Sequence, residues 1–118
     1  SYVESDLINS YAWDTAIVYI QAMGNENYAN ANRATTGHTS LMNTGSTGDE
    51  KCKIFDMAGN ELEWTTEYST HTDSSFAYPC ACRGGYCNYS GYYTSVRSNY
   101  YATVSSSYIS FRPLLYVK

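Results

Sequence analysis

Three closely spaced thiols are the residues of this chain whose types and spacing most suggest chemistry. Cys80, Cys82 and Cys87 could form part of a metal cluster, but structural zinc sites prefer paired C-x₂₋₄-C elements completed by a further Cys or His. Neither His38 nor His71 completes such a pattern. With Cys52 the thiols could also form two disulfides in three connectivities, and the spacing does not choose among them. We predict no metal site, no cofactor and unpaired thiols.

Carboxylates gather around a second segment, at Asp56, Glu61, Glu63 and Glu67. Glycosidase acid and base chemistry requires two facing carboxyl groups about 5–10 Å apart across a cleft. Alternation along a strand places Glu61 and Glu63 on the same side. The pattern therefore favours carboxylates that are solvated, or hydrogen-bonded to loops, over a catalytic pair.

Tyrosine dominates the stretch from residue 80 to residue 113, which holds seven of the fourteen tyrosines, mixed with Ser, Asn and Gly. These tyrosines lack the regular apolar partners with which a helix or strand would bury them, so we expect them at the surface. Antibody paratopes have the same composition, in which aromatic rings supply contact area and small polar residues supply adaptable hydrogen bonds. The composition predicts recognition without chemistry.

Length and charge limit the classes of partner. A chain of 118 residues can bury an independent core, so we expect one domain spanning residues 1–118. Only 15% of residues are charged and the net charge is −4, which argues against a nucleic-acid partner. The chain has no run of about 18 apolar residues, so we predict no membrane insertion. No signal peptide is recognised at its start. The absence of an initiator Met suggests a processed form or the C-terminal part of a longer protein.

The elements that would position these residues are short and widely spaced. Trp13, Ile17 and Ile20 recur at three- and four-residue steps, which predicts a helix over about residues 11–23 with Ser10 as its N-cap.

The segment 25–49 is rich in Asn, Thr, Gly and Ser and predicts long loops, with one helical turn near 40–43. Leu62 and Trp64 alternate with polar residues as in a half-buried strand, and Pro113 belongs at an edge or bulge of the last strands.

Eight large apolar side chains are assigned to the core, and three glycines to places where the backbone bends or approaches closely. The core set is Trp13, Ile17, Ile20, Phe55, Leu62, Trp64, Ile109 and Phe111, and the glycines are Gly59, Gly84 and Gly85. For Arg83, Arg97 and Arg112 we expect hydrogen bonds to loop carbonyl groups, with a role facing a ligand as the alternative.

Four segments resemble, in order, the hallmark segments of the formylglycine-generating enzyme, or sulfatase-modifying factor, domain. They are Ser10-Tyr11-Ala12-Trp13, Asp56-Met57-Ala58-Gly59-Asn60-Glu61-Leu62-Glu63-Trp64-Thr65, Arg83-Gly84-Gly85 and Phe111-Arg112-Pro113. The resemblance covers roughly residues 7–117. It implies an α+β, C-type-lectin-like fold with a small antiparallel sheet, one or two helices and long loops.

Enzymatic members of that family use a pair of cysteines a short distance beyond the R-G-G segment to handle copper and oxygen. Here Cys87 lies too close to that segment, and Tyr89 and Thr94 occupy the positions expected for the pair. The resemblance therefore implies a protein that is not an enzyme, with a copper-dependent cysteine oxidase as the alternative.

A second branch resembles this chain more closely, namely the variable proteins of diversity-generating retroelements, which end in a hypervariable stretch near F-R-P-L-L. Reverse transcription there scrambles template adenines and converts Asn codons into small, polar and aromatic residues, including Cys. The resemblance implies an exchangeable binding surface of fifteen residues: Cys82, Tyr86, Cys87, Asn88, Tyr89, Tyr92, Tyr93, Ser98, Asn99, Tyr100, Tyr101, Ser105, Ser106, Ser107 and Tyr108.

Such variable proteins are displayed on phage tails or on bacterial surfaces. The resemblance therefore implies an outward-facing domain that binds a cell-surface protein or glycan, with weak contacts strengthened by several copies. A domain has only about 5–15 kcal/mol of net stability, and a large-to-small change in the core costs several kcal/mol. Exchangeable positions must therefore lie outside the core.

Overall fold

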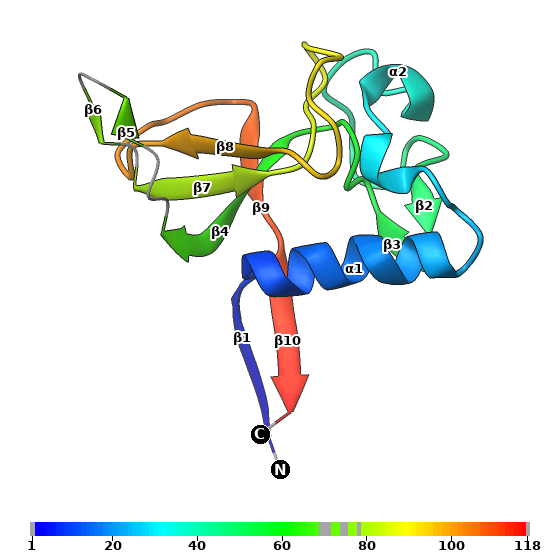
Figure 1. Ribbon diagram of the computed structural model, residues 1–118, viewed down its shortest axis with the longest axis horizontal. Coiled ribbons are helices and arrows are strands. Elements are labelled where there is room, and N and C mark those ends of the chain that lie inside the picture. The colour runs from blue at the N-terminus through cyan, green and yellow to red at the C-terminus, as the bar shows by residue number, and fades with distance from the viewer. Residues whose placement is uncertain (1, 69–71, 74–75, 78, 118) are drawn as a thin grey trace.

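The computed structural model describes residues 2–68, 72–73, 76–77 and 79–117, so His71 lies outside the described residues. The chain forms a small α+β domain with few helices and several small sheets (Figure 1). Its elements are β1 (Val3–Leu7), α1 (Ser10–Ala22), η1 (Tyr28–Asn30), α2 (Arg33–Thr36), β2 (Glu50–Lys51), β3 (Ile54–Phe55), β4 (Leu62–Tyr68), β5 (Thr72–Asp73), β6 (Phe76–Ala77), β7 (Cys80–Arg83), β8 (Arg97–Tyr100), β9 (Ile109–Phe111) and β10 (Pro113–Val117). No helix in these ranges is long and apolar enough to cross a membrane.

The largest sheet has the strand order β8-β7-β4-β9. Its first three strands are antiparallel, as expected, whereas β9 runs parallel to β4 with Leu62 opposite Ile109. The strands β1 and β10 form a separate antiparallel ribbon that projects from the body beyond α1 and carries both chain ends at its tip (Figure 1). Pro113 begins β10, which agrees with the prediction of an edge position.

The predicted helix is present and begins one residue earlier than expected. Ser10 is not its N-cap, because the Asn9 side chain accepts the hydrogen bond from the Ala12 N–H at 2.8 Å. The Ser10 hydroxyl donates instead to Glu67. The buried face of α1 packs in a cluster with Ile8, which follows β1, and with residues of η1 and of the segment after β3, which places the core against α1.

The segment 25–49 is mostly loop, as expected, but the predicted turn at 40–43 is wrong. The helical turns are η1 and α2, which begin earlier. The Asn32 side chain caps α2 by accepting hydrogen bonds from the backbone N–H groups of Ala34 and Thr35. The Thr35 hydroxyl oxygen in turn accepts from the Asn32 N–H.

The assignment of core residues is correct for four of the eight. Trp13, Ile17, Ile20 and Leu62 are buried, while Phe55, Trp64 and Ile109 are half-buried. Phe111 is 66% exposed, so its assignment to the core is wrong.

An inward-facing arginine explains the exposure of Phe111. Arg112 Nε and Nη2 each donate to the Glu63 carboxylate at 2.8 Å, and Nη2 also donates to the Phe55 carbonyl at 2.7 Å. Because neighbours along a strand face opposite ways, the inward Arg112 turns Phe111 outward. Glu63 is buried in this ion pair, not solvated, and its burial raises its pKa to about 6 despite the guanidinium.

Candidate functional site

The seven tyrosines of the C-terminal stretch lie at the surface, on loop 84–96, on β8 and on loop 101–108. Tyr89, Tyr93, Tyr101 and Tyr108 are exposed, and Tyr86, Tyr92 and Tyr100 are half-buried. We call these seven residues the tyrosine face. The prediction of surface tyrosines is confirmed for the four exposed rings and only in part for the three half-buried ones.

Ring contacts connect four members of the tyrosine face. Tyr86 lies 5.4 Å from Tyr92 and 6.0 Å from Tyr108 between ring centroids, and Tyr89 packs edge-on against Tyr92 at 5.4 Å. Each such pair contributes about 0.5–1.5 kcal/mol beyond area burial. The two loops therefore support each other through side chains that remain accessible.

The polar residues predicted for the binding surface divide by exposure. Asn88, Ser105, Ser106 and Ser107 are exposed. Ser98 and Asn99 are half-buried on β8, which is an outer strand of the four-stranded sheet.

Two predicted members of the surface are buried, and for them the expectation of exposure is wrong. Cys82 is 0% exposed and lies in β7, which β4 and β8 flank on both sides. Cys87 is 1% exposed, and its N–H donates to the Asn60 carbonyl at 3.0 Å. Burial raises the pKa of Cys82 to about 12 and also raises that of Cys87, so both thiols are protonated at neutral pH.

Glycines fix the start of loop 84–96. Gly84 has a φ of 84°, and a Cβ at this position would lie 2.8 Å from the Met57 carbonyl oxygen. A Cβ on Gly85 would lie 2.6 Å from the carbonyl oxygen of Tyr92. The backbone approaches so closely here that no side chain fits, as the sequence predicts. Gly59 meets the backbone of Arg33 in the same way, at 2.8 Å.

Buried hydrogen bonds fix the other end of the loop. Thr94 is fully buried, and its N–H and hydroxyl donate to the Ala31 carbonyl at 2.9 and 3.1 Å. The Thr94 carbonyl accepts from Trp13 Nε1 at 3.0 Å, and Ser95 N–H donates to the Ala29 carbonyl at 3.2 Å. These bonds attach the loop to α1 and to the η1 region.

Arg83 joins the same loop end to the helix. Its side chain is 1% exposed and donates to the carbonyls of Val96 at 2.9 Å and Ser95 at 3.2 Å, and to Asp14 at 2.5 Å. Arg97 also binds Asp14, at 2.8 Å. Partial burial raises the pKa of Asp14, but the hydrogen bonds and charges of the two guanidinium groups outweigh burial and hold that pKa below its usual value.

The expectation of carbonyl bonds is confirmed for Arg83 and Arg112. For Arg97 it is wrong, because this side chain binds the carboxylates of Asp14 and Glu67. All three guanidinium groups of the C-terminal stretch are therefore engaged within the chain. In the described part of the chain, no three His, Cys, Asp or Glu side chains are grouped so as to hold a metal ion.

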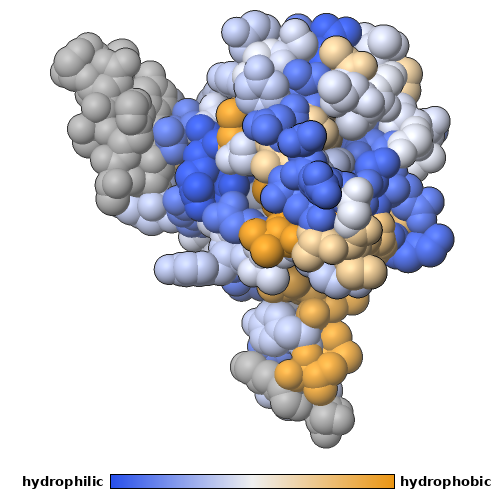
Figure 2. All heavy atoms as spheres, turned by 45° about the vertical axis from the view of Figure 1, so that its right-hand side comes forward, coloured by the Kyte–Doolittle hydropathy of each residue, from blue (hydrophilic) through white to orange (hydrophobic). Residues whose placement is uncertain are grey.

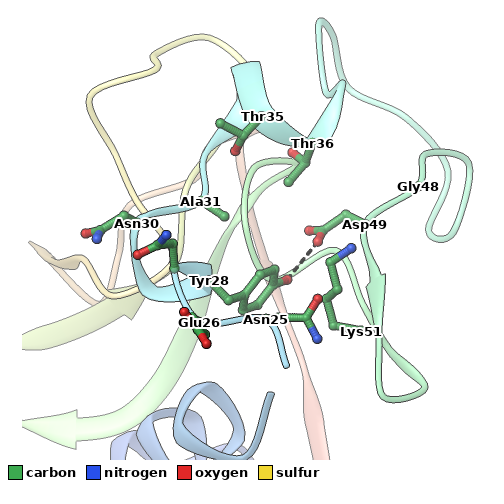
Figure 3. Close-up of a pocket in the computed structure, with 11 residues that line it drawn as sticks. Asn25, Glu26, Tyr28, Asn30, Ala31, Thr35, Thr36, Gly48, Asp49 and Lys51 are labelled. Carbon is green, nitrogen blue, oxygen red and sulfur yellow. Dashed lines mark hydrogen bonds between the residues drawn. The ribbon is translucent and has the colours of Figure 1, made fainter. Parts of the chain in front are cut away.

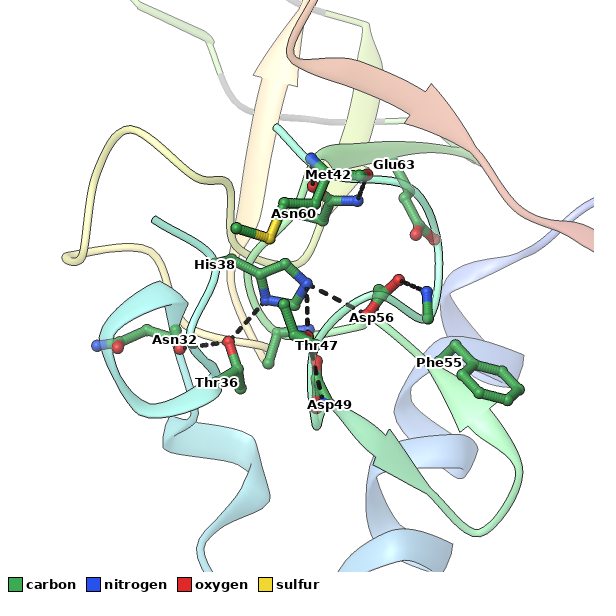
Figure 4. Close-up of polar contacts among 12 residues, drawn as sticks. Asn32, Thr36, His38, Met42, Thr47, Asp49, Phe55, Asp56, Asn60 and Glu63 are labelled. Atoms are coloured by element: carbon green, nitrogen blue, oxygen red, sulfur yellow. Dashed lines mark hydrogen bonds and ion pairs between the residues drawn. The ribbon is translucent and has the colours of Figure 1, made fainter. Parts of the chain in front are cut away.

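A buried polar cluster that sequence reasoning missed holds the long segment before β2 (Figure 4). His38 is fully buried, with Nδ1 2.8 Å from Thr36 Oγ1 and Nε2 3.2 Å from Asp56 Oδ1. Asp56 Oδ2 accepts from Gly45 N–H at 2.6 Å. No local signal pairs residues 38 and 56, so only their spatial proximity identifies the cluster.

A cavity of about 480 Å³ lies beside η1 and α2 (Figure 3). At its edge the Tyr28 hydroxyl donates to Asp49 Oδ1 at 2.8 Å, and Asp49 Oδ2 accepts from the Ala58 N–H at 3.0 Å. Burial and the neighbouring Asp49 carboxylate raise the pKa of Tyr28. Both polar groups are satisfied within the chain, so this pair joins η1 to the segments before β2 and after β3.

Comparison with known proteins identifies a likeness to a solved structure. No family model and no curated protein matches the chain. Among solved structures, the chain is similar to Treponema denticola variable protein 1, with a TM-score of 0.63 and 17% sequence identity over 92% of this chain. The two chains share a fold. The alignment covers 46% of the other chain, so this chain spans about half the length of that protein. The resemblance to variable proteins drawn from the sequence is confirmed as a likeness of fold.

Proposed function

We propose that this chain is a non-catalytic, C-type-lectin-like ligand-binding domain whose tyrosine face is exchangeable, in the manner of the variable proteins of diversity-generating retroelements. The observation that carries the proposal is the separation of roles in loop 84–96. Its backbone is held by hydrogen bonds from Cys87 to the Asn60 carbonyl and from Thr94 to the Ala31 carbonyl. Tyr89 and Tyr93, which lie between these two anchors, are exposed.

The energetics support this separation. Substitutions at exposed positions away from special features usually change stability by less than about 0.5 kcal/mol. The groups that hold the loop from outside are the backbone carbonyls of Ala29, Ala31 and Asn60. They accept from backbone N–H groups of Ser95, Thr94 and Cys87, and these bonds remain whatever the exposed side chains are. Binding can therefore change while the fold remains.

The chemistry of the face favours an uncharged binding surface. The arginines of the stretch are bound to carboxylates and carbonyls of the chain, and the exposed members are Tyr, Ser and Asn. Tyrosine supplies apolar rings together with hydroxyl groups, which suit protein surfaces and glycans. We propose a protein or glycan ligand on the surface of another cell, with the domain displayed on a phage tail or a bacterial surface in several copies.

The oxidase alternative requires accessible thiolates. Cys82 and Cys87 are buried, and burial raises the pKa of each thiol, so neither provides a reactive thiolate at the surface. This arrangement supports recognition over oxidation.

A pair of displayed libraries tests the proposal even though the natural ligand is unidentified. One library randomises the exposed Tyr89, Tyr93, Tyr101 and Ser105–Ser107, and the control randomises an equal number of buried frame residues. We expect most members of the first library, and few of the second, to unfold cooperatively. Selection of the first library against a chosen protein such as lysozyme should also yield binders. If the two libraries contain equal fractions of unfolded members, the proposal that the tyrosine face is exchangeable is contradicted.

A further inference from the structure

Large apolar side chains are exposed along the projecting β1–β10 ribbon and the strand that leads into it. The exposed fractions are 66% for Phe111, 67% for Leu115, 71% for Val117 and 60% for Val3. Pro113 is exposed between Phe111 and Leu115. We call these five residues the apolar stripe. Figure 2 shows hydrophobic side chains gathered on the projecting part of the molecule.

Strand alternation explains why the stripe is continuous. Arg112 turns inward to Glu63 and Leu114 packs against the core, so the odd-numbered residues from 111 to 117 face outward. In the antiparallel register Val3 lies opposite Val117, and Ser5 lies opposite Leu115.

The face that carries the stripe contains no charged residue within β1 and β10. The acidic residues of β1 are Glu4 and Asp6, which pair in register with Tyr116 and Leu114 on the opposite face. Within the β1–β10 ribbon the stripe is therefore both apolar and uncharged.

The exposed area is large for a chain of this size. At these exposed fractions, and with side chains of roughly 150–200 Å² each, the stripe leaves roughly 500 Å² of apolar surface in water. The largest apolar patch on a typical monomer is about 300–600 Å² and is often functional. An isolated two-stranded ribbon is also only marginally stable in water, and packing of one face stabilises it.

We propose that the apolar stripe is a contact between two copies of this chain, packed ribbon against ribbon about a two-fold axis. A two-fold interface brings the same patch of both copies together, so the patch must complement itself. An uncharged apolar face does so, whereas the opposite face would bring Glu4 and Asp6 of both copies together. One partner in a typical stable interface contributes about 800 Å², and roughly 500 Å² from the stripe supplies most of this area.

The arrangement leaves the tyrosine face free. The ribbon projects on the side of α1 away from loop 84–96, so two copies joined at their ribbons present two separate tyrosine faces (Figure 1). Two linked faces bind a repetitive surface more tightly than one, because the second contact forms at a high effective concentration. The dimer contact itself does not depend on the proposed function.

Sedimentation equilibrium of the 118-residue chain, with a reductant present because Cys52 is exposed, tests the contact. We expect a dimer with a dissociation constant in the micromolar range or tighter. Leu115→Asp should weaken association about a hundredfold or more, because it places a charge in an apolar contact. Val18→Asp is the matched control, since Val18 is an apolar residue of α1, 64% exposed and outside the stripe, and it should leave association unchanged.

Two results would overturn the proposal. One is a wild-type chain that remains monomeric up to about 100 µM, well above a micromolar dissociation constant, which would assign the stripe to a different partner. The other is a Leu115→Asp variant that dimerises like the wild type. If Leu115→Asp proves unfolded by circular dichroism, Leu115→Ser replaces it. A folded Leu115→Ser chain should associate about tenfold more weakly, and unchanged association would equally refute the contact.

Discussion

Replacement of Arg83 is the most direct test of whether buried bonds hold loop 84–96 to the rest of the chain. Arg97 is its matched control. Both guanidinium groups bind Asp14, but the Arg83 side chain is 1% exposed and that of Arg97 is 47% exposed. Replacement by Met retains much of the apolar stem and removes the charge and the hydrogen bonds. The two variants therefore differ mainly in burial.

The magnitude follows from the bonds that are lost. Breaking a buried ion pair typically costs about 3–5 kcal/mol, but Asp14 is 45% exposed and keeps Arg97, which reduces that part. The carbonyls of Ser95 and Val96 lose their donor, at about 1 kcal/mol each. We expect Arg83→Met to lower the free energy of unfolding by about 2–4 kcal/mol. Arg97→Met should cost no more than about 1 kcal/mol, because its ion pairs are solvent-screened.

Urea unfolding followed by tryptophan fluorescence provides the assay, since Trp13 is buried beside Arg83. With a slope of about 1–3 kcal/mol/M, the expected loss for Arg83→Met lowers the midpoint by about 1 M or more. Equal midpoints for the two variants, or a loss below about 1 kcal/mol for Arg83→Met, would refute the view that buried bonds at Arg83 hold the loop.

Two further predictions concern titration and thiol access. The pKa of Glu63 is about 6 in the folded chain against 4.5 unfolded, so the folded state binds the extra proton and stability falls as pH rises from about 4.5 to 6. The unfolding free energy of Glu63→Gln minus that of the wild type should therefore rise by about 2 kcal/mol over that window. Urea titrations at several pH values measure this difference. A difference that does not change with pH would contradict the raised pKa of the buried carboxylate. In a disulfide-exchange assay Cys52, which is exposed, should react at once, whereas Cys82 and Cys87 should react only at the rate of unfolding; rapid reaction of all thiols would show that the two are accessible.

Local sequence patterns predicted the features that depend on neighbouring residues. The periodicity of Trp13, Ile17 and Ile20 located α1 to within a residue at each end, and the lack of apolar periodicity around the tyrosines placed them at the surface. Gly84 and Gly85 were also correct, because close backbone approach excludes a side chain whatever the partner is.

The folded arrangement was needed to show which side of a strand faces the core and which distant groups pair. The eight-residue core assignment placed Phe111 inside, but Glu63, forty-nine residues before Arg112, draws the arginine inward and leaves Phe111 in water. Cys82 is buried because β4 and β8 flank β7, and residues 38 and 56 meet only when the chain is folded. Composition and periodicity act over a few residues, whereas burial depends on partners supplied by distant segments. Local sequence therefore specifies what the surface is made of, and the fold selects which side chains belong to it.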